Sequence, residues 1–211
     1  AENYVPITWA SHVDIETGRP VEAENADHRV EFQVTKPAPF GGHNWQPMAY
    51  NESAGLVYIP AMENVSLYST PETFEYIEGH YWNMAQNEDL SGNDPINGMS
   101  PTLVNAVMKH LLRGRLIAWD PIDQKEKWRV EHSSAWNGGV LTTSAGLVFQ
   151  GDGAGYLSAY DATTGERIWR YNVGNGIIAP PVSYEIEGEQ YIALMVGWGG
   201  AVGLLFDQPE A

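Results

Sequence analysis

Two segments of this chain place a tryptophan beside glycines in a pattern that suits a flat ligand. They are Trp136–Gly139 and Gly197–Ala201. Glycine lets the backbone approach a ligand closely, and an indole ring can lie against the face of a planar group. A third segment, His43–Trp45, starts an expected strand with two polar side chains and a ring. They suit a planar, polar cofactor, although for each segment alone a turn packed under a ring is the stronger interpretation.

Other kinds of chemistry have little support in the sequence. Six histidines are scattered without a pair at metal-ligand spacing, and there is no cysteine, so thiolate sites, disulfides and CxxCH haem attachment are excluded. No Ser/His/Asp pattern, phosphate-binding glycine loop or calcium loop occurs. Glu63, Asp89 and Asp94 are more typical of a solvated surface than of a cation site. We therefore assign no catalytic and no metal-binding residue within this chain.

The elements that must hold these segments repeat along the chain. Residues 116–120 and 157–161 each place an aspartate two residues after an alanine, and Trp128 and Trp169 follow at the same distance in the two copies. An aspartate at a strand end accepts backbone N–H bonds and closes a turn. A third turn of this kind is expected at Asp14–Gly18. A step of roughly 40 residues that carries four short strands is typical of a β-propeller blade.

A second repeat runs in register with the first. Trp45 and Trp136 stand at the same distance before Gly55–Tyr58 and Gly146–Phe149, and Pro181–Tyr184 begins a weaker third copy. A plain β-sandwich with similar hairpins is the alternative, but agreement among three spacings favours the propeller.

We therefore expect an all-β fold of propeller blades that is incomplete in this chain. The predicted parts are a partial blade over residues 1–35, a blade over 36–130 with an insertion at 64–112, a blade over 131–173 and a partial closing blade over 174–211.

Composition narrows the class of protein. The chain has 8 Trp, 11 Tyr, 22 Gly and 13 Pro in 211 residues, as expected for stacked sheets joined by tight turns. No apolar run is long enough to span a bilayer as a helix. The formal net charge of −16 argues against nucleic acid and anionic membrane surfaces as partners. It favours either a basic protein partner or a solvated acidic surface that aids solubility.

The motifs resemble the C-terminal part of the quinoprotein alcohol dehydrogenases, the methanol- and ethanol-oxidising enzymes that use pyrroloquinoline quinone (PQQ). The resemblance rests on Gly41–Tyr50, Trp136–Gly151 and Gly197–Ala201. In addition, Ala159–Trp169 matches the family's tryptophan-docking motif, which joins successive blades of an eight-bladed propeller. Leu116–Trp128 is a degenerate copy of that motif, in which Gln124 replaces the glycine.

The resemblance implies a periplasmic enzyme. In this family PQQ lies near the propeller axis beside Ca²⁺, an aspartate acts as general base on the alcohol, hydride passes to the quinone, and electrons leave to a cytochrome c. Carried over by motif, Asn44 and Trp45 reach the edge of PQQ, Trp136 lies close to its rings, and Gly200 and Ala201 offer backbone at its polar rim.

The resemblance also implies that parts are missing. The family's calcium ligands, base and second stacking face belong to the portion that precedes this one. We therefore expect the chain to be inactive without its N-terminal propeller portion or a companion chain, with a small alcohol as substrate. Trp169 is expected to dock between blades. The alternatives are a propeller scaffold that has lost redox chemistry and an unrelated interaction module.

Overall fold

The computed structural model describes residues 2–29, 33–70, 72–79, 87–88 and 112–199 and divides the chain into two compact units. The first unit comprises Ala1–Val5, Phe40–Glu63 and Leu112–Ala211, and the second comprises Pro6–Pro39 and Asn64–Leu111. Within the described residues every regular element is a strand except one short 3-10 turn, which confirms the all-β prediction.

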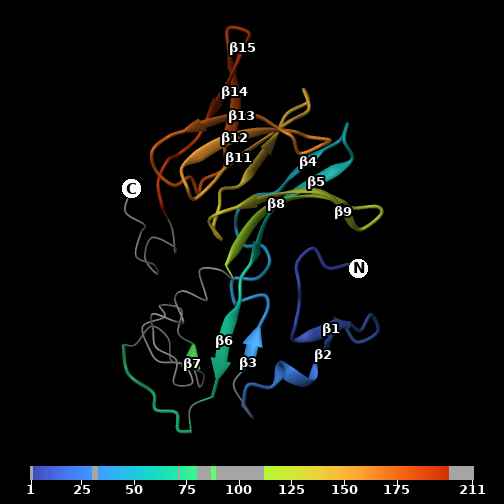
Figure 1. The fold of residues 1–211 in the computed structure, drawn as a ribbon, viewed down its shortest axis with the longest axis vertical. Helices are drawn as coiled ribbons and strands as arrows, with labels where there is room; N and C mark the ends of the chain where they lie inside the picture. The colour runs from blue at the N-terminus through green and yellow to red at the C-terminus, as the bar shows by residue number, and fades with distance from the viewer. Residues whose placement is uncertain (1, 30–32, 71, 80–86, 89–111, 200–211) are drawn as a thin grey trace. The chain divides into compact units, whose positions relative to one another are not determined.

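The first unit contains two four-stranded antiparallel sheets and one hairpin, coloured from cyan through yellow to red in Figure 1. The first sheet has the order β4 (Ala49–Asn51), β5 (Leu56–Glu63), β8 (Arg113–Asp120), β9 (Lys125–His132). The second has the order β10 (Val140–Thr142), β11 (Leu147–Gly151), β12 (Tyr156–Asp161), β13 (Arg167–Asn172). The hairpin pairs β14 (Val182–Ile186) with β15 (Glu189–Ala193).

The repeat seen in the sequence is reproduced in strand register. Ala118 lies opposite Trp128 in the first sheet, and Ala159 lies opposite Trp169 in the second. In both sheets the register shifts immediately after the alanine. The two copies therefore share a local backbone geometry as well as a residue pattern.

One hydrophobic core joins the two sheets. Tyr58 and Leu116 of the first sheet cluster with Val148 and Tyr160 of the second, and each is at most 2% exposed. The opposite face of β5 and β8 is covered by a separate cluster that includes Val5. The central strands are thus buried on both faces, whereas β13 is exposed along its length.

Aspartate turns occur at all three predicted places. The Oδ1 atoms of Asp14, Asp120 and Asp161 each accept the backbone N–H groups two and three residues later, at 2.8–3.2 Å. These bonds stabilise the carboxylates and lower the pKa of all three, that of Asp120 to about 2 with help from Lys127. In each turn the fourth residue after the aspartate is left-handed, with φ of 69°, 51° and 74° at Gly18, Gln124 and Gly165, respectively.

The second unit consists of two small sheets. One pairs β1 (Ala10–Val13) with β2 (Pro20–Glu22), and a 3-10 turn, η1 (Glu24–Ala26), follows. The other has the order β3 (Gln33–Thr35), β6 (Ser66–Ser69), β7 (Asn87–Glu88). The stretch predicted as an insertion therefore contributes two strands, one of which pairs with the chain's N-terminal part. Most of its remainder lies outside the described residues.

Candidate cofactor site

Asn44 is held in a local turn by both ends of its side-chain amide. Its Nδ2 donates to Phe40 O at 2.9 Å, and its Oδ1 accepts from the Trp45 backbone N–H at 2.9 Å. An amide has two N–H groups and two lone pairs on its oxygen, so these bonds leave one donor and one acceptor position unused. The structure thus assigns Asn44 a turn role that is compatible with a further hydrogen bond.

The neighbours of Asn44 include an exposed ring and an unsatisfied oxygen. The Trp45 side chain is 51% exposed, which is unusual for a large aromatic residue. Gln46 is 2% exposed, and its Oε1 has no hydrogen-bond partner. Buried polar atoms are normally paired, so this oxygen is suited to a donor from an ordered water or a ligand. The segment therefore offers the kinds of groups that a planar, polar cofactor uses.

Trp136 is buried in the protein. Its side chain is 7% exposed and packs edge-to-face on Phe40, with ring centroids 5.5 Å apart. Met62 and Ile178 belong to the same cluster, and the Trp198 ring packs against it. Phe40 links Asn44 to Trp136, because its carbonyl contacts the first and its ring the second. The structure thus brings residues from all three predicted site segments together.

Two glycines outside the predicted segments pack against the ring of Trp198, which belongs to one of those segments. A Cβ atom at Gly153 or Gly176 would approach the Trp198 indole within 2.8 Å or 2.4 Å. The glycines of the predicted segments differ from these: a Cβ at Gly139 would meet Pro47 and Pro180, and one at Gly197 or Gly199 would meet nothing within 4 Å. Gly200 and Ala201 lie outside the described residues.

Within this chain the docked tryptophan belongs to the degenerate copy of the motif. Trp128 of β9 is 9% exposed, and its Nε1 donates to Ala162 O at 3.1 Å. A Cβ at Gly165 would lie 2.7 Å from its indole, so that turn accepts the ring only because residue 165 is glycine. Tyr58 donates its hydroxyl proton to the same carbonyl at 2.8 Å. The equivalent Trp169, in which we expected the docking role, is 47% exposed in this chain.

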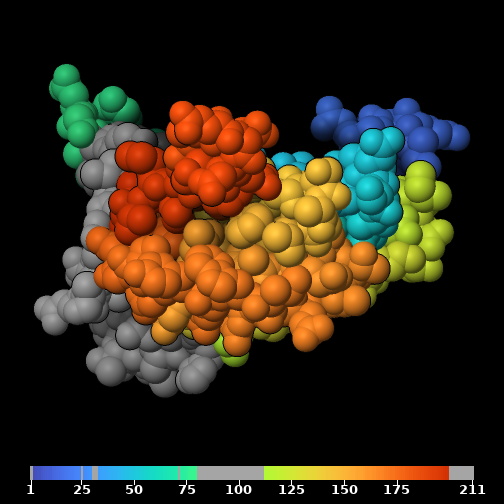
Figure 2. All heavy atoms as spheres, turned by 90° about the horizontal axis from the view of Figure 1, so that it is seen from above, coloured from blue at the N-terminus to red at the C-terminus, as the bar shows by residue number. Residues whose placement is uncertain are grey.

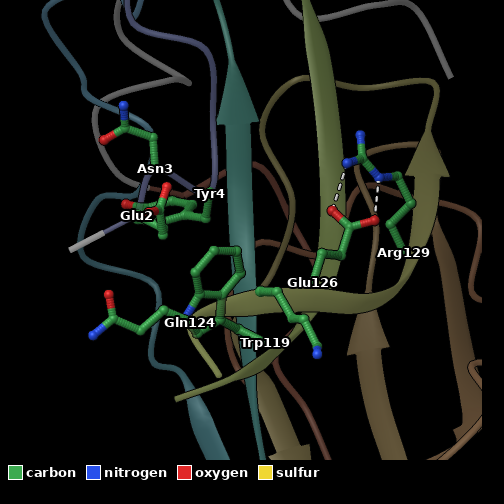
Figure 3. Close-up of a pocket in the computed structure, with 8 residues that line it drawn as sticks. Glu2, Asn3, Tyr4, Trp119, Gln124, Glu126 and Arg129 are labelled. Atoms are coloured by element: carbon green, nitrogen blue, oxygen red, sulfur yellow. Dashed lines mark hydrogen bonds and ion pairs between the residues drawn. The ribbon is translucent and has the colours of Figure 1, made fainter. Parts of the chain in front are cut away.

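A shallow cavity elsewhere in the first unit contains none of the predicted site residues. It has a volume of about 270 Å³ and includes Tyr4, edge-to-face with Trp119 at 6.4 Å (Figure 3). Its cations have carboxylate partners: Lys125 pairs with Asp123, and Arg129 with Glu126. The complete lining is Glu2, Asn3, Tyr4, Trp119, Gln124, Lys125, Glu126 and Arg129.

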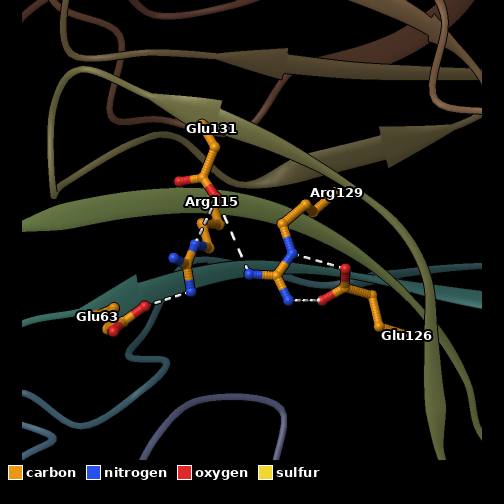
Figure 4. A network of polar contacts seen from close by, with 5 residues as sticks. All are labelled: Glu63, Arg115, Glu126, Arg129 and Glu131. Atoms are coloured by element: carbon orange, nitrogen blue, oxygen red, sulfur yellow. Dashed lines mark hydrogen bonds and ion pairs between the residues drawn. The ribbon is translucent and has the colours of Figure 1, made fainter.

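The charged side chains beside this cavity form a neutralising network (Figure 4). Arg115 bridges Glu63 and Glu131, and Arg129 bridges Glu126 and Glu131. The hydrogen bonds that Arg129 donates to Glu126 raise the pKa of Arg129. The network leaves no concentrated charge for a ligand, so we regard it as structural.

The described part of the chain contains neither a cluster of metal ligands nor a membrane-spanning helix. No group of three or more His, Asp or Glu side chains is arranged there to hold a metal ion. Asp89 and Asp94 lie outside the described residues. No helix among the described residues is long and apolar enough to cross a membrane.

Comparison with known proteins defines the class as a quinoprotein β-propeller. Residues 113–192 match the family model described as "Glucose/ethanol/alcohol dehydrogenase, beta-propeller domain" of the PQQ group. The solved structure of quinohemoprotein alcohol dehydrogenase ADHIIG from Pseudomonas putida is similar with a TM-score of 0.83 and 34% identity. That match covers 95% of this chain and 29% of the other.

Two curated relatives extend the similarity over nearly the whole sequence. Quinohemoprotein alcohol dehydrogenase ADH IIB of Pseudomonas putida is 40% identical over 97% of this chain and 28% of its own length. The 1-butanol dehydrogenase (cytochrome c) of Thauera butanivorans is 38% identical over 96% of this chain and 28% of its own. The chain is homologous to one part of the PQQ quinoprotein alcohol dehydrogenases and spans a little more than a quarter of the length of these relatives.

Proposed function

We propose that this chain is the C-terminal portion of a periplasmic, PQQ- and Ca²⁺-dependent dehydrogenase that oxidises a small alcohol and passes electrons to a cytochrome c. The observation that carries the proposal is the 40% identity to a quinohemoprotein alcohol dehydrogenase over 97% of the chain. The name of the Thauera relative, which includes cytochrome c, supports the acceptor. When bound, the quinone supplies the carbonyl carbon that accepts hydride from the alcohol.

Within this proposal the chain contributes one wall of the cofactor site. Trp45 is the residue best placed for ring contact, because its indole is exposed. The unused N–H of Asn44 is available for a hydrogen bond. Trp136 belongs to the buried cluster against which Phe40 packs, so its role is to support this segment rather than to contact the cofactor. Gly200 and Ala201 remain predicted backbone contacts. The base and the calcium ligands are expected from the remainder of the propeller.

The division into blades is part of the same proposal. We assign the sheet β4–β5–β8–β9 to the predicted blade 36–130, the sheet β10–β13 to the blade 131–173 and the hairpin β14–β15 to the closing blade 174–211. The strands around β1–β3 then belong to the partial blade 1–35.

The remaining portion of the propeller has a defined place to dock. The outer strand β13 exposes Ile168, Trp169 and Tyr171 by 58%, 47% and 60%. Among the described residues β14 and β15 pair only with each other and expose further aromatic rings. Figure 2 shows the orange segment that carries β13 and the red segment of the β14–β15 hairpin on the visible surface of the molecule. Exposed sheet faces of this kind favour association.

Cofactor titration tests the proposed function. PQQ is added with Ca²⁺ to the complete assembled protein, and binding is followed by quinone absorbance and tryptophan fluorescence. Trp45→Ala should weaken PQQ binding roughly ten- to hundredfold, since a ring contact of about 1–3 kcal/mol is lost. Tyr50→Ala, which removes another exposed ring of the same segment, is the matched control and should bind PQQ normally.

Asn44→Ala separates the two roles of that residue. A cofactor contact predicts weaker PQQ retention with an unchanged melting temperature of the cofactor-free protein. A lower melting temperature with unchanged PQQ affinity would reduce Asn44 to a turn residue. If the unmodified assembled protein binds no PQQ at all, the chain belongs instead to a scaffold without redox chemistry.

A further inference from the structure

A buried histidine outside the predicted site is linked to it through hydrogen bonds. His132, the last residue of β9, is 7% exposed, and its Nε2 lies 2.8 Å from Gln150 Oε1. Gln150, on β11, is 1% exposed, and its Nε2 donates to Gly138 O at 2.9 Å. Since the amide nitrogen is used on Gly138, the amide oxygen faces the imidazole and accepts from it. His132 therefore carries its proton on Nε2.

The Trp136–Gly139 segment is fixed at its centre by these bonds. Gly138 N donates to Gly151 O at 2.9 Å, and Gly138 O accepts from Gln150, so β11 holds both backbone groups of Gly138. A Cβ at this position would lie about 3 Å from the carbonyl oxygens of Ala179, Ile177 and Gly151, so only glycine fits there. A shift of the Gln150 amide would be transmitted directly to the neighbouring Trp136.

We propose that His132 and Gln150 are positioning residues that hold the Trp136–Gly139 segment in its cofactor-ready conformation, and that protonation of His132 loosens the segment. The link to the cofactor rests on the proposed function, whereas the effect on the segment itself does not.

Burial of His132, set against the charges around it, decides the direction of the effect. Glu131 precedes it on β9, Asp152 follows β11, and Arg170 lies on β13. Arg170 is 3.8 Å from Asp152, so much of that carboxylate's attraction is already used. Burial is the largest cause that lowers the pKa of His132, and Arg170 adds to it. Gln150, Asp152 and Glu131 oppose the shift without cancelling it.

The sign of the pH dependence follows from this shift. The unfolded histidine has a pKa of about 6.5, and the folded one lies lower. As pH falls below about 6.5, the unfolded or locally opened state binds more protons than the closed one. The stability of the closed segment is therefore full above about pH 6.5 and is lost as pH falls through the folded pKa of His132.

Three substitutions separate the hydrogen bonds from the proton. His132→Gln places an amide nitrogen near the position of Nε2, so it keeps a donor but does not titrate. Gln150→Met preserves length and removes both hydrogen bonds. His12→Gln, at an exposed histidine of β1, is the matched control.

Hydrogen–deuterium exchange of a peptide covering residues 133–140 is measured in the cofactor-free assembled protein at about pH 7.5 and about pH 5.5, on either side of the ordinary histidine pKa. Protection factors are corrected for the intrinsic effect of pH. In wild type and His12→Gln the protection factor should fall several-fold at the lower pH. In His132→Gln the protection factor should be the same at both pH values. Gln150→Met should lose about tenfold at both pH values, as expected for hydrogen bonds removed inside a protein.

Equal pH responses of wild type and His132→Gln would overturn the proton-linked part, and full protection in Gln150→Met would overturn the positioning role. If Gln150→Met does not fold, His132→Gln alone still decides the pH response. PQQ affinity is measured on the same proteins and should follow protection. If the variants show the expected changes in protection but the protein binds no PQQ, the result would count against the proposed function and still support the positioning role.

Discussion

Gln124 occupies a backbone conformation that the two other aspartate turns give to glycine. Its φ of 51° lies in the left-handed region, where a side chain is strained. We predict that Gln124→Gly stabilises the protein by about 0.5–1 kcal/mol, because relief of this strain exceeds the added chain entropy of glycine. Denaturant midpoints measure the change.

Two reverse substitutions serve as controls for this prediction. A Cβ at Gly18 would have no neighbour within 4 Å, so Gly18→Ala should lower the free energy of unfolding only by the backbone strain, about 1 kcal/mol. Gly165→Ala also drives a Cβ against the Trp128 ring at 2.7 Å and should cost clearly more, about 2–4 kcal/mol. Equal costs at the two glycines would contradict the docking geometry.

Tyr58 should make stability fall in strong alkali. Burial raises its pKa to about 12, with the Asp161 carboxylate adding to the shift. Between the unfolded pKa of about 10 and this value the folded state holds more protons, so its contribution to stability falls as pH rises. Tyr58→Phe should cost about 1 kcal/mol at neutral pH through the lost bond to Ala162 O, and less above pH 10. Urea unfolding at several pH values tests this, and parallel curves for the two proteins would refute it.

Single residues of the site were only partly predictable from sequence. The segment His43–Trp45 was predicted from its polar and aromatic pattern, and the exposure of Trp45 leaves its ring available for a ligand. The burial of Trp136 and the turn bonds of Asn44 depend on Phe40, to which no motif points. The unsatisfied Gln46 Oε1 and the His132–Gln150 pair depend on contacts between distant strands, which spacing alone does not reveal.

Two tryptophans that are equivalent in register differ in whether their docking partner is present. We predict that Trp128→Ala costs about 3–5 kcal/mol, as for other large-to-small changes in a core, because its ring fills the space over Gly165. In the chain by itself Trp169→Ala should cost under about 1 kcal/mol, because that ring is 47% exposed.

In the assembled protein the cost of Trp169→Ala should rise toward that of Trp128→Ala, since a further blade covers the ring. Comparing thermal melts of the chain alone and of the assembly checks both statements. A small cost of Trp169→Ala in both settings would exclude a docking role for this residue.

At the level of elements the sequence repeat predicted the strands well, because it depends on residues that are close together in the chain. The spacing of the aspartates and of the tryptophans predicted the strands that end at Asp120 and Asp161 and the strands that follow them. The pairing of β3 with β6 was not predictable, because it joins segments without periodicity. Docking was assigned to the better motif match, but the degenerate copy is the one with a partner in this chain.

The chain by itself should associate through its uncovered faces. We predict that the isolated 211-residue chain forms oligomers or aggregates. The reason is that β13 and the β14–β15 hairpin expose apolar side chains beside edges that no other described strand pairs with. Sedimentation analysis measures this. Trp169→Lys with Tyr171→Lys should reduce association, while Tyr76→Lys, at an exposed tyrosine of the second unit, should not.

The mass of the native protein, determined with and without denaturant, tests the central claim most directly. If the chain is one portion of a quinoprotein propeller, the native particle will exceed 23.3 kDa and will carry PQQ. Denaturant will then release either this chain and a companion or a single longer polypeptide. A monodisperse 23.3 kDa monomer that melts in one sharp cooperative transition would contradict the account.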